Sequence, residues 1–104
     1  MLNKWDIILV DFPFREDPSQ TKQRPCVIID VDNESVEFVI VGITSTPARR
    51  ETDYAIKYCR QAHIKEGSVV MTDHIVKVSA SVNFRHIGHL DKTDRLNVMR
   101  LMDR

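Results

Sequence analysis

Short apolar runs, each ended by a polar or proline-containing segment, make up most of this chain and restrict it to a mainly β fold. Runs of this length that are rich in β-branched and aromatic residues favour strands, because such side chains pack well on a pleated surface. Turn-forming residues separate the runs, and the longest polar segment, residues 15–23, is predicted to be a mobile loop. The predicted strands are residues 5–12, 25–31, 36–43, 53–58, 67–71, 75–82 and 84–90, with one helical turn at residues 61–65.

The last segment has the pattern of an amphipathic helix. Asp91 supplies an N-cap side chain, and Asp94 places an acid near the positive end of the helix dipole. Apolar residues then recur every three or four positions and predict the face that packs on the sheet: Leu96, Met99 and Met102, widened by Val98 and Leu101. We therefore predict a single domain over residues 1–104, a small and strongly curved antiparallel β-barrel with a C-terminal α-helix packed on it.

Composition excludes several functional classes. The chain carries 15 Lys plus Arg and 15 Asp plus Glu, so any nucleic-acid binding must come from a local basic patch. Cys26 and Cys59 match no zinc spacing and are too few for a disulfide framework, and Cys26 is expected to be a buried free thiol. No apolar stretch reaches transmembrane length and no signal peptide precedes Trp5, so we expect a cytoplasmic protein without membrane association.

Polar residues at the ends of two apolar strands are the strongest functional signal. Arg24 stands directly before the second predicted strand, and Thr44 and Ser45 follow the third. If the two strands are neighbours in one sheet, a permanent cation and a hydroxyl pair meet at one edge of the barrel. An arginine fork matches the geometry of a phosphate and keeps its charge. The pattern therefore predicts a phosphate receptor.

Each of these residues also has a structural interpretation. Arg24 could form an ion pair with Asp11 or Glu16, which would leave it unavailable to a ligand. Thr44 could cap a backbone group at the end of its strand, as Ser and Thr side chains often do in turns. Ser45 is more readily explained as a loop residue than as a donor to a ligand.

The four histidines give a weaker signal. His74 follows Asp73, and a carboxylate beside an imidazole can form an acid–base unit, although neighbours on a strand point to opposite faces. His86 and His89 also face opposite ways on a predicted strand, so no shared metal is predicted. His63 has no recognisable companion. Solvated positions at the edge of the fold are the default interpretation for all four histidines.

A basic segment follows the third predicted strand. From Thr44 to Lys65 there are five basic side chains and two acids, with Tyr54 and Tyr58 interleaved. A nucleic-acid base could stack on such a ring while the cations track the backbone. The alternative is a solvated surface in which the two tyrosines lie partly in the core.

Three patches, in this order, resemble the MazF/PemK-like toxins of type II toxin–antitoxin systems over nearly the whole chain. The most specific is a D-F-P-F segment at residues 11–14, a loop, and K-x-R-P at residues 22–25 before an apolar strand. The second is V-G-I-T-S at residues 41–45. The third is G-S-V-V-M-T-D at residues 67–73, followed by I-G-H-L-D at residues 87–91 and the last helix.

The resemblance implies a dimeric SH3-like barrel of the MazF/CcdB type that cuts single-stranded RNA without a metal or other cofactor. The products would be a 2′,3′-cyclic phosphate and a 5′-hydroxyl. The positions matching the family's catalytic pair are Arg24 and Thr44, and Asp73 would orient the reacting groups or hold a loop. Substrate contacts are expected from Lys22, Ser45, Thr46, Arg49, Arg50 and Tyr54.

The resemblance also implies partners and leaves rival functions open. The usual partner is a small antitoxin whose disordered tail fills the RNA groove, and with it the toxin could bind DNA. The main alternative is a non-catalytic module of the same fold that binds nucleic acid or a protein without cleaving it. A relative of this fold poisons DNA gyrase by protein contact alone, so fold does not settle chemistry. An inactive antitoxin-binding protein is the other alternative.

Overall fold

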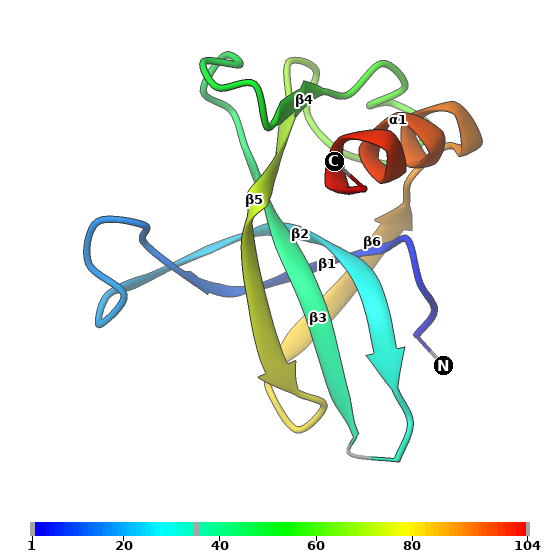
Figure 1. Cartoon of the computed structure of the whole chain (residues 1–104). Coiled ribbons are helices and arrows are strands. Elements are labelled where there is room, and N and C mark those ends of the chain that lie inside the picture. Colours follow the sequence, from blue (N-terminus) through cyan, green and yellow to red (C-terminus); the bar gives the residue numbers. More distant parts are fainter. Residues whose placement is uncertain (1, 35, 104) are drawn as a thin grey trace.

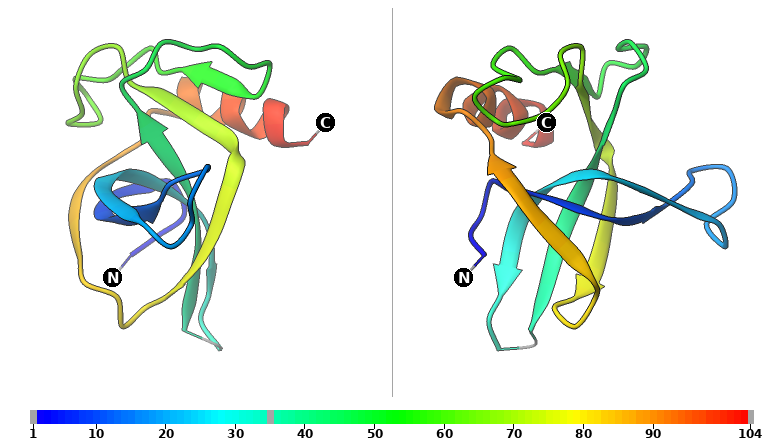
Figure 2. Two further views of the ribbon diagram at one scale, coloured as in Figure 1. Left: turned by 90° about the vertical axis from the view of Figure 1, so that its left-hand side faces the viewer. Right: turned by 180° about the vertical axis from the view of Figure 1, so that it is seen from behind.

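The computed structural model describes residues 2–34 and 36–103, and within them six strands form one antiparallel sheet in the order β4-β5-β3-β2-β1-β6. Figures 1 and 2 show that the sheet is strongly curved, with β1 and β2 crossing β3 and β5, and with α1 against one end. The predicted mainly β fold with a C-terminal helix is confirmed. The elements are β1 (Asp6–Pro13), β2 (Thr21–Asp32), β3 (Glu37–Thr44), β4 (Asp53–Ala55), β5 (Val69–Ser79), β6 (Phe84–His89) and α1 (Lys92–Met102).

Both faces of the sheet are buried near its centre, which explains why the strands read as continuous apolar runs. Ile7 and Ile8 are neighbours on β1 and point to opposite faces, yet both are fully buried. Ile7 belongs to the core cluster that Val98 of α1 also joins. Ile8 belongs to a second cluster, which β1 shares with β2 and β3 and which contains Phe12. A strict alternation of apolar and polar residues would have left one of these clusters incomplete.

The β1–β2 hairpin is longer than predicted. β2 begins at Thr21 instead of residue 25, and residues 21–23 pair with residues 11–13 of β1. The prediction of a mobile loop over residues 15–23 is therefore wrong at its C-terminal end. Pro25 is tolerated inside β2 because the strand is paired only with β1 at this point, where Pro25 lies opposite Leu9, and pairing with β3 begins at Cys26. The Pro25 nitrogen, which has no hydrogen to donate, therefore leaves no β3 acceptor without a donor.

The two strands predicted at residues 67–71 and 75–82 are one strand, β5, with an irregular middle. Val70 pairs with Ile43 and Ile75 pairs with Val41, so residues 71–74 lie opposite Gly42 alone. A β-carbon on Gly42 would lie 2.8 Å from both the Met71 Cε and the Phe12 Cε2 atoms. The register between β3 and β5 shifts between Val41 and Ile43, and this bulge changes the direction of β5 where Asp73 and His74 stand.

The segment after β4 departs from the prediction because its backbone donors find acceptors outside the sheet. β4 ends at Ala55, and the Ile56 amide donates to the Ser68 carbonyl at 3.0 Å. The Lys57 and Tyr58 amides donate to the carboxyl group of Asp94 on α1. The helical turn predicted at residues 61–65 lies about three residues earlier: the Ala62 amide donates to the Tyr58 and Cys59 carbonyls, and the His63 amide donates to the Arg60 carbonyl.

The predicted packing face of α1 is partly wrong. Asp91 is the N-cap, as predicted, and its side chain accepts from the Thr93 amide at 3.0 Å. Asp94 and Val98 are fully buried, however, while Leu96 and Met99 are 47% and 41% exposed. The hydrogen bonds to Asp94 fix the rotation of the helix, so the buried face follows the spacing of four that starts at this acid instead of the Leu96–Met99 stripe.

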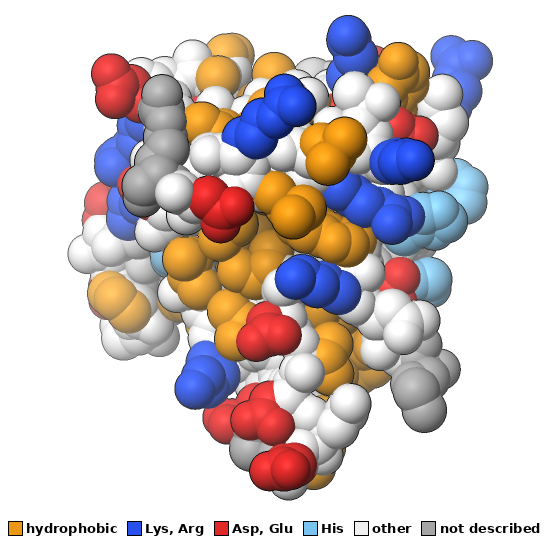
Figure 3. Space-filling model, turned by 45° about the vertical axis from the view of Figure 1, so that its right-hand side comes forward, with side chains coloured by type: hydrophobic (Ala, Val, Ile, Leu, Met, Phe, Trp, Pro, Cys, Tyr) orange, Lys and Arg blue, Asp and Glu red, His pale blue; other side chains and the backbone are white. Residues whose placement is uncertain are grey.

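The surface is unevenly charged although the net charge is zero. Figure 3 shows hydrophobic side chains gathered across one face, with Asp and Glu side chains at its lowest part, where the β2–β3 hairpin lies. Exposed acids there include Asp30, Asp32 and Glu34. In the described parts of the chain, no helix is long and apolar enough to cross a membrane.

Both cysteines are buried free thiols, as expected for Cys26. Burial raises the pKa of Cys26 to about 12, although the charge of Arg24 acts in the opposite direction. A thiol held in its protonated form is a poor nucleophile and a poor metal ligand. Cys26 is therefore a core residue rather than part of a reactive site.

Candidate active site

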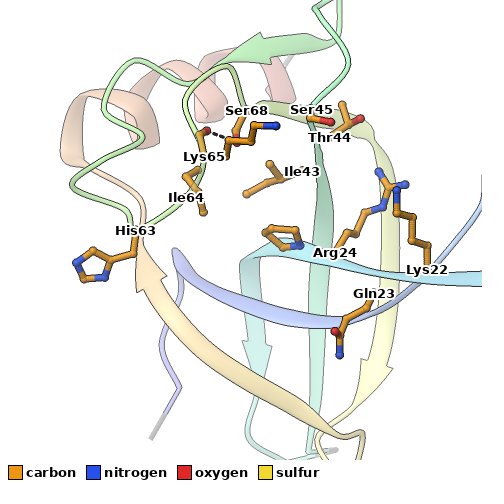
Figure 4. Close-up of a pocket in the computed structure, with 11 residues that line it drawn as sticks. Lys22, Gln23, Arg24, Ile43, Thr44, Ser45, His63, Ile64, Lys65 and Ser68 are labelled. Atoms are coloured by element: carbon orange, nitrogen blue, oxygen red, sulfur yellow. Dashed lines mark hydrogen bonds between the residues drawn. The ribbon is translucent and has the colours of Figure 1, made fainter.

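Arg24 and Thr44 line one pocket of about 320 Å³, because their strands are neighbours in the sheet. Arg24 lies on β2 opposite Val10 of β1, and Thr44 is the last residue of β3. Figure 4 shows the Lys22 and Arg24 side chains reaching from β2 toward Thr44 and Ser45. The structure thus brings the guanidinium and the hydroxyl together at one edge of the sheet, as their positions at strand ends predicted.

The Arg24 guanidinium is available to a ligand. Its Nε is buried and finds no hydrogen-bond partner among the described residues. Within residues 2–34 and 36–103 no carboxylate forms an ion pair with it, so the interpretation that pairs Arg24 with Asp11 or Glu16 is wrong. An unpaired buried N–H costs about 1–3 kcal/mol. An anion in this pocket would remove that cost.

Thr44 is fixed in place by its own turn and can still donate. Its Oγ1 accepts a hydrogen bond from the Thr46 amide at 3.2 Å, which is the capping role that the structural interpretation foresaw. A threonine hydroxyl has one donor hydrogen and two acceptor positions. Capping uses one acceptor position, so the hydrogen remains free to point at a ligand in the half-buried site.

Two further hollows adjoin this pocket, one at both residues of the pair and one at Thr44 alone. Arg24 and Thr44 also line a cavity of about 150 Å³, together with Phe14, Glu16, Thr46, Arg49 and His74. Thr44, Thr46 and Arg49 continue into a third hollow, which Arg50 also lines. The pair therefore stands at a junction between pockets, with space on both sides for the groups attached to a phosphate.

Asp73 is turned toward two other arginines. Its carboxylate lies 2.9 Å from Arg15 Nη2 and 3.7 Å from Arg50 Nη1. Burial raises the pKa of Asp73, but the Arg15 hydrogen bond and the charges of Arg15 and Arg50 outweigh it and lower the pKa below its ordinary value. A carboxylate held in this way ties the β1–β2 loop to the loop after β3. The geometry suits the loop-holding role of Asp73 better than direct contact with a substrate.

Tyr54 is not brought to the pocket. Its ring packs against the core cluster under α1, and its hydroxyl donates to Asp94 and accepts from Asn97 Nδ2 at 3.2 Å. Burial, followed by the hydrogen bond to Asp94, raises the pKa of Tyr54 to about 12. This is the core placement that the sequence left open as the alternative. Tyr54 is therefore a packing residue under α1, and the prediction that it contacts the substrate is wrong.

The loop after β3 carries Arg49 and Arg50 in a fixed turn. Both backbone amides donate to Asp53 Oδ2, at 3.1 and 3.2 Å. The turn leaves the Arg49 side chain on the cavity that Arg24 and Thr44 share. Arg50 forms an ion pair with Asp73, and 51% of its side chain is exposed.

The lining residues that sequence reasoning did not assign to the site include Lys65, Ser68 and His74. Lys65 and Ser68 line the larger pocket, and the Ser68 hydroxyl donates to the Lys65 carbonyl at 2.6 Å. Lys65 is the last basic residue of the segment 44–65, and that position could have identified it as a pocket residue. His74 lines the smaller cavity, and its position beside Asp73 was the signal there. Ser68 carried no signal of its own.

The remaining histidines form no shared centre. His63 lines the larger pocket, but its Nδ1 lies 3.0 Å from the Ile87 carbonyl oxygen, and Figure 4 shows its ring at the side far from Arg24 and Thr44. His86 Nε2 lies 3.6 Å from Asp6 Oδ2, and His89 is exposed. The described part of the chain holds no group of three or more His, Cys, Asp or Glu side chains that could bind a metal ion.

Comparisons with known proteins define the family. Residues 3–103 match the profile described as PemK-like, MazF-like toxin of type II toxin-antitoxin system. No curated protein sequence matched the chain.

Solved structures share the fold at low sequence identity. An endoribonuclease from Mycobacterial species has a TM-score of 0.74 and 13% identity, covering 97% of this chain and 86% of that chain. An endoribonuclease in complex with its cognate antitoxin, also from Mycobacterial species, has a TM-score of 0.77 and 13% identity, with 98% and 91% covered. MazE-MazF (Form-III) from Deinococcus radiodurans has a TM-score of 0.75 and 10% identity, with 97% and 92% covered. With nearly every residue matched by the family profile, the chain belongs to the PemK-like, MazF-like toxins of type II toxin–antitoxin systems.

Proposed function

We propose that this protein is an endoribonuclease toxin that cuts single-stranded RNA in the cytoplasm without a metal ion or other cofactor. The observation that carries the proposal is the pocket in which the unpaired Arg24 guanidinium meets the Thr44 hydroxyl. Family membership supports it, as do the relatives of the same fold that are described as endoribonucleases. The cleaved bond would be a phosphodiester held at the junction of the pockets.

The chemistry needs positioning and charge stabilisation. The ribose 2′-hydroxyl attacks the neighbouring phosphorus, and the 5′-oxygen leaves, which gives a 2′,3′-cyclic phosphate and a 5′-hydroxyl. Arg24 stabilises the negative charge that grows on the phosphate oxygens in the transition state. Thr44 donates to a phosphate oxygen and thereby aligns the attacking group. Arg24 cannot accept a proton, because its guanidinium stays charged at every relevant pH.

Basic side chains around the pair would hold the RNA backbone. Lys22 lies beside Arg24 on β2, Lys65 faces the larger pocket and Arg49 faces the smaller cavity. Ser45 and Thr46 add hydroxyl donors at the end of β3. The acidic end of the molecule lies at the β2–β3 hairpin, so the local field directs a polyanion toward the pocket although the net charge is zero.

The test is cleavage of a mixed-sequence single-stranded RNA by the purified protein near neutral pH with EDTA present. We expect fragments that end in a 2′,3′-cyclic phosphate and begin with a 5′-hydroxyl. An RNA with 2′-deoxyribose at the cleaved position should resist, since the nucleophile is missing. RNA that is retained but never cut would contradict the proposal and favour a binding module, and gyrase inhibition with intact RNA would favour a protein-contact poison.

We also propose a cognate antitoxin as the protein partner. Two relatives of the same fold were crystallised with antitoxins, and the unpaired cation of this pocket would accept an acidic side chain as readily as a phosphate. A short neighbouring reading frame with an acidic C-terminal tail is the expected source. Its product should co-purify with this protein and abolish RNA cleavage. An adjacent product that binds but leaves cleavage unchanged would contradict occupation of the site.

A homodimer is the proposed assembly. Leu96 and Met99 are exposed on α1, and hydrophobic side chains gather on one face of the molecule. Exposed apolar patches mark interfaces, and a two-fold dimer covers the same patch on both copies. We expect Leu96→Glu combined with Met99→Glu to shift the mass measured by light scattering from dimer to monomer. Ser81→Glu, an exposed position in the turn between β5 and β6, is the control and should stay dimeric; a double variant that also stays dimeric places the interface elsewhere.

A further inference from the structure

His74 shares the smaller cavity with Arg24 and Thr44. The irregular register of β5 places it there, because residues 71–74 lie opposite Gly42 alone. Its ring packs edge-on against the buried ring of Phe12, with centroids 4.6 Å apart and planes at 66°. The half-buried imidazole is thus held in one orientation by β1, at the junction where a phosphodiester would lie.

Neither Arg24 nor Thr44 can accept the proton that the ribose 2′-hydroxyl must lose when it attacks phosphorus. Arg24 is already protonated, and a threonine hydroxyl is a very weak base. The Asp73 carboxylate is occupied by Arg15 and Arg50. Of the described residues lining the smaller cavity, His74 and Glu16 carry the side chains able to accept a proton, and Glu16 is exposed on the β1–β2 loop. His74 is the one held in a fixed position.

The charges around His74 favour its neutral form. Burial lowers the pKa of His74, the charges of Arg15 and Arg24 act in the same direction, and Asp73 and Glu16 oppose them without prevailing. Arg49, from the loop after β3, adds another positive charge on the same cavity. A pKa below the ordinary 6.5 leaves the imidazole unprotonated at neutral pH. An unprotonated ring nitrogen is what a general base requires.

We propose that His74 is the general base of RNA cleavage by this protein, an inference that rests on the proposed function. As the 2′-oxygen bonds to phosphorus, its proton passes to a ring nitrogen of His74. The bond from phosphorus to the 5′-oxygen breaks, and the 5′-oxygen takes a proton from water. The imidazolium then releases its proton to the hydroxide so formed, which restores the enzyme. Arg24 stabilises the phosphate oxygens throughout, and Thr44 keeps the phosphate aligned.

The test compares His74→Gln with the wild type on single-stranded RNA. We expect kcat to fall by about 10²-fold or more, the usual contribution of a positioned base. Wild-type kcat should fall about tenfold for each pH unit below the His74 pKa, because the base becomes protonated, and the variant should lose this acidic limb. Added imidazole should restore part of the activity of His74→Gly. His89→Gln, at an exposed histidine of β6, is the matched control and should cleave like the wild type.

Failure of this inference can be told apart from failure of the proposed function. A wild type that cleaves RNA, beside a folded His74→Gln that keeps kcat within about threefold and keeps the acidic limb, would overturn the role of His74 alone. A wild type that cuts no RNA would overturn both. If His74→Gln does not fold, NMR titration of His74 in the wild type replaces it. Agreement between that pKa and the kinetic one supports the base, and disagreement overturns it.

Discussion

Arg24→Ala is expected to lower kcat for RNA cleavage by about 10³-fold while the protein remains folded. The guanidinium acts on charge that is present only in the transition state, so the loss should appear in kcat more than in KM. Its Nε is buried without a hydrogen-bond partner among the described residues. Because that group costs stability, its removal should leave the free energy of unfolding unchanged or slightly higher.

Arg24→Lys separates charge from geometry at the same position. A lysine keeps the positive charge and loses the planar fork that binds two phosphate oxygens, so activity should lie between those of the wild type and the alanine variant. Arg85→Ala, at an exposed arginine of β6 away from the pocket, is the control and should cleave normally. An Arg24→Ala protein that keeps a tenth or more of wild-type kcat, about 1.4 kcal/mol of barrier or less, would show that charge stabilisation lies elsewhere.

The meeting of Arg24 and Thr44 could be predicted because it depends on strand order alone. Each residue stands at the end of a short apolar run, and a tight polar connection predicts that the two runs form neighbouring strands. Neighbouring antiparallel strands place the start of one beside the end of the other. The side-chain chemistry of the pair then follows from position, without knowledge of any loop.

Placement of the other site residues depends on contacts that no local pattern encodes. His74 enters the cavity because residues 71–74 bulge from β5 opposite Gly42. The regular alternation of a strand, in which successive side chains point to opposite faces, does not hold across this bulge and cannot place His74. Tyr54 lies under α1 because its hydroxyl meets Asp94, which is 40 residues away in the sequence. The periodicity of a single sequence indicates neither the bulge in β5 nor the hydrogen bond between Tyr54 and Asp94. It therefore assigned Tyr54 to the RNA and left His74 at the edge.

The same limit explains the error in the face of α1. Leu96 and Met99 form the more apolar stripe, and burial of that stripe alone would be favourable. Burying Asp94 reverses the choice, because the amides of Lys57 and Tyr58 would otherwise lose their acceptor. An unsatisfied buried donor costs about 1–3 kcal/mol, which is comparable to the gain from burying one large apolar side chain. Polar satisfaction therefore decides how the helix is rotated.

Asp94→Ala is expected to lower the free energy of unfolding by about 3 kcal/mol or more. The side chain is fully buried and accepts from the Lys57 amide at 2.9 Å, the Tyr58 amide at 3.0 Å and the Tyr54 hydroxyl. Alanine leaves all three donors without a partner and opens a void between α1 and the segment after β4. Urea unfolding followed by circular dichroism measures the change.

Two matched variants separate this network from ordinary helix capping. Asp91→Ala removes the N-cap of the same helix at a half-buried position and should cost only about 1 kcal/mol. Tyr54→Phe removes one of the three donors while leaving the acceptor paired with two amides, so its cost should also stay near about 1 kcal/mol. If Asp94→Ala proved no more destabilising than Asp91→Ala, Asp94 would not be what anchors α1. The segment between β4 and β5, which brings Lys65 and Ser68 to the larger pocket, would then be held mainly by apolar contacts such as those of Cys59 and Ala62 with the core.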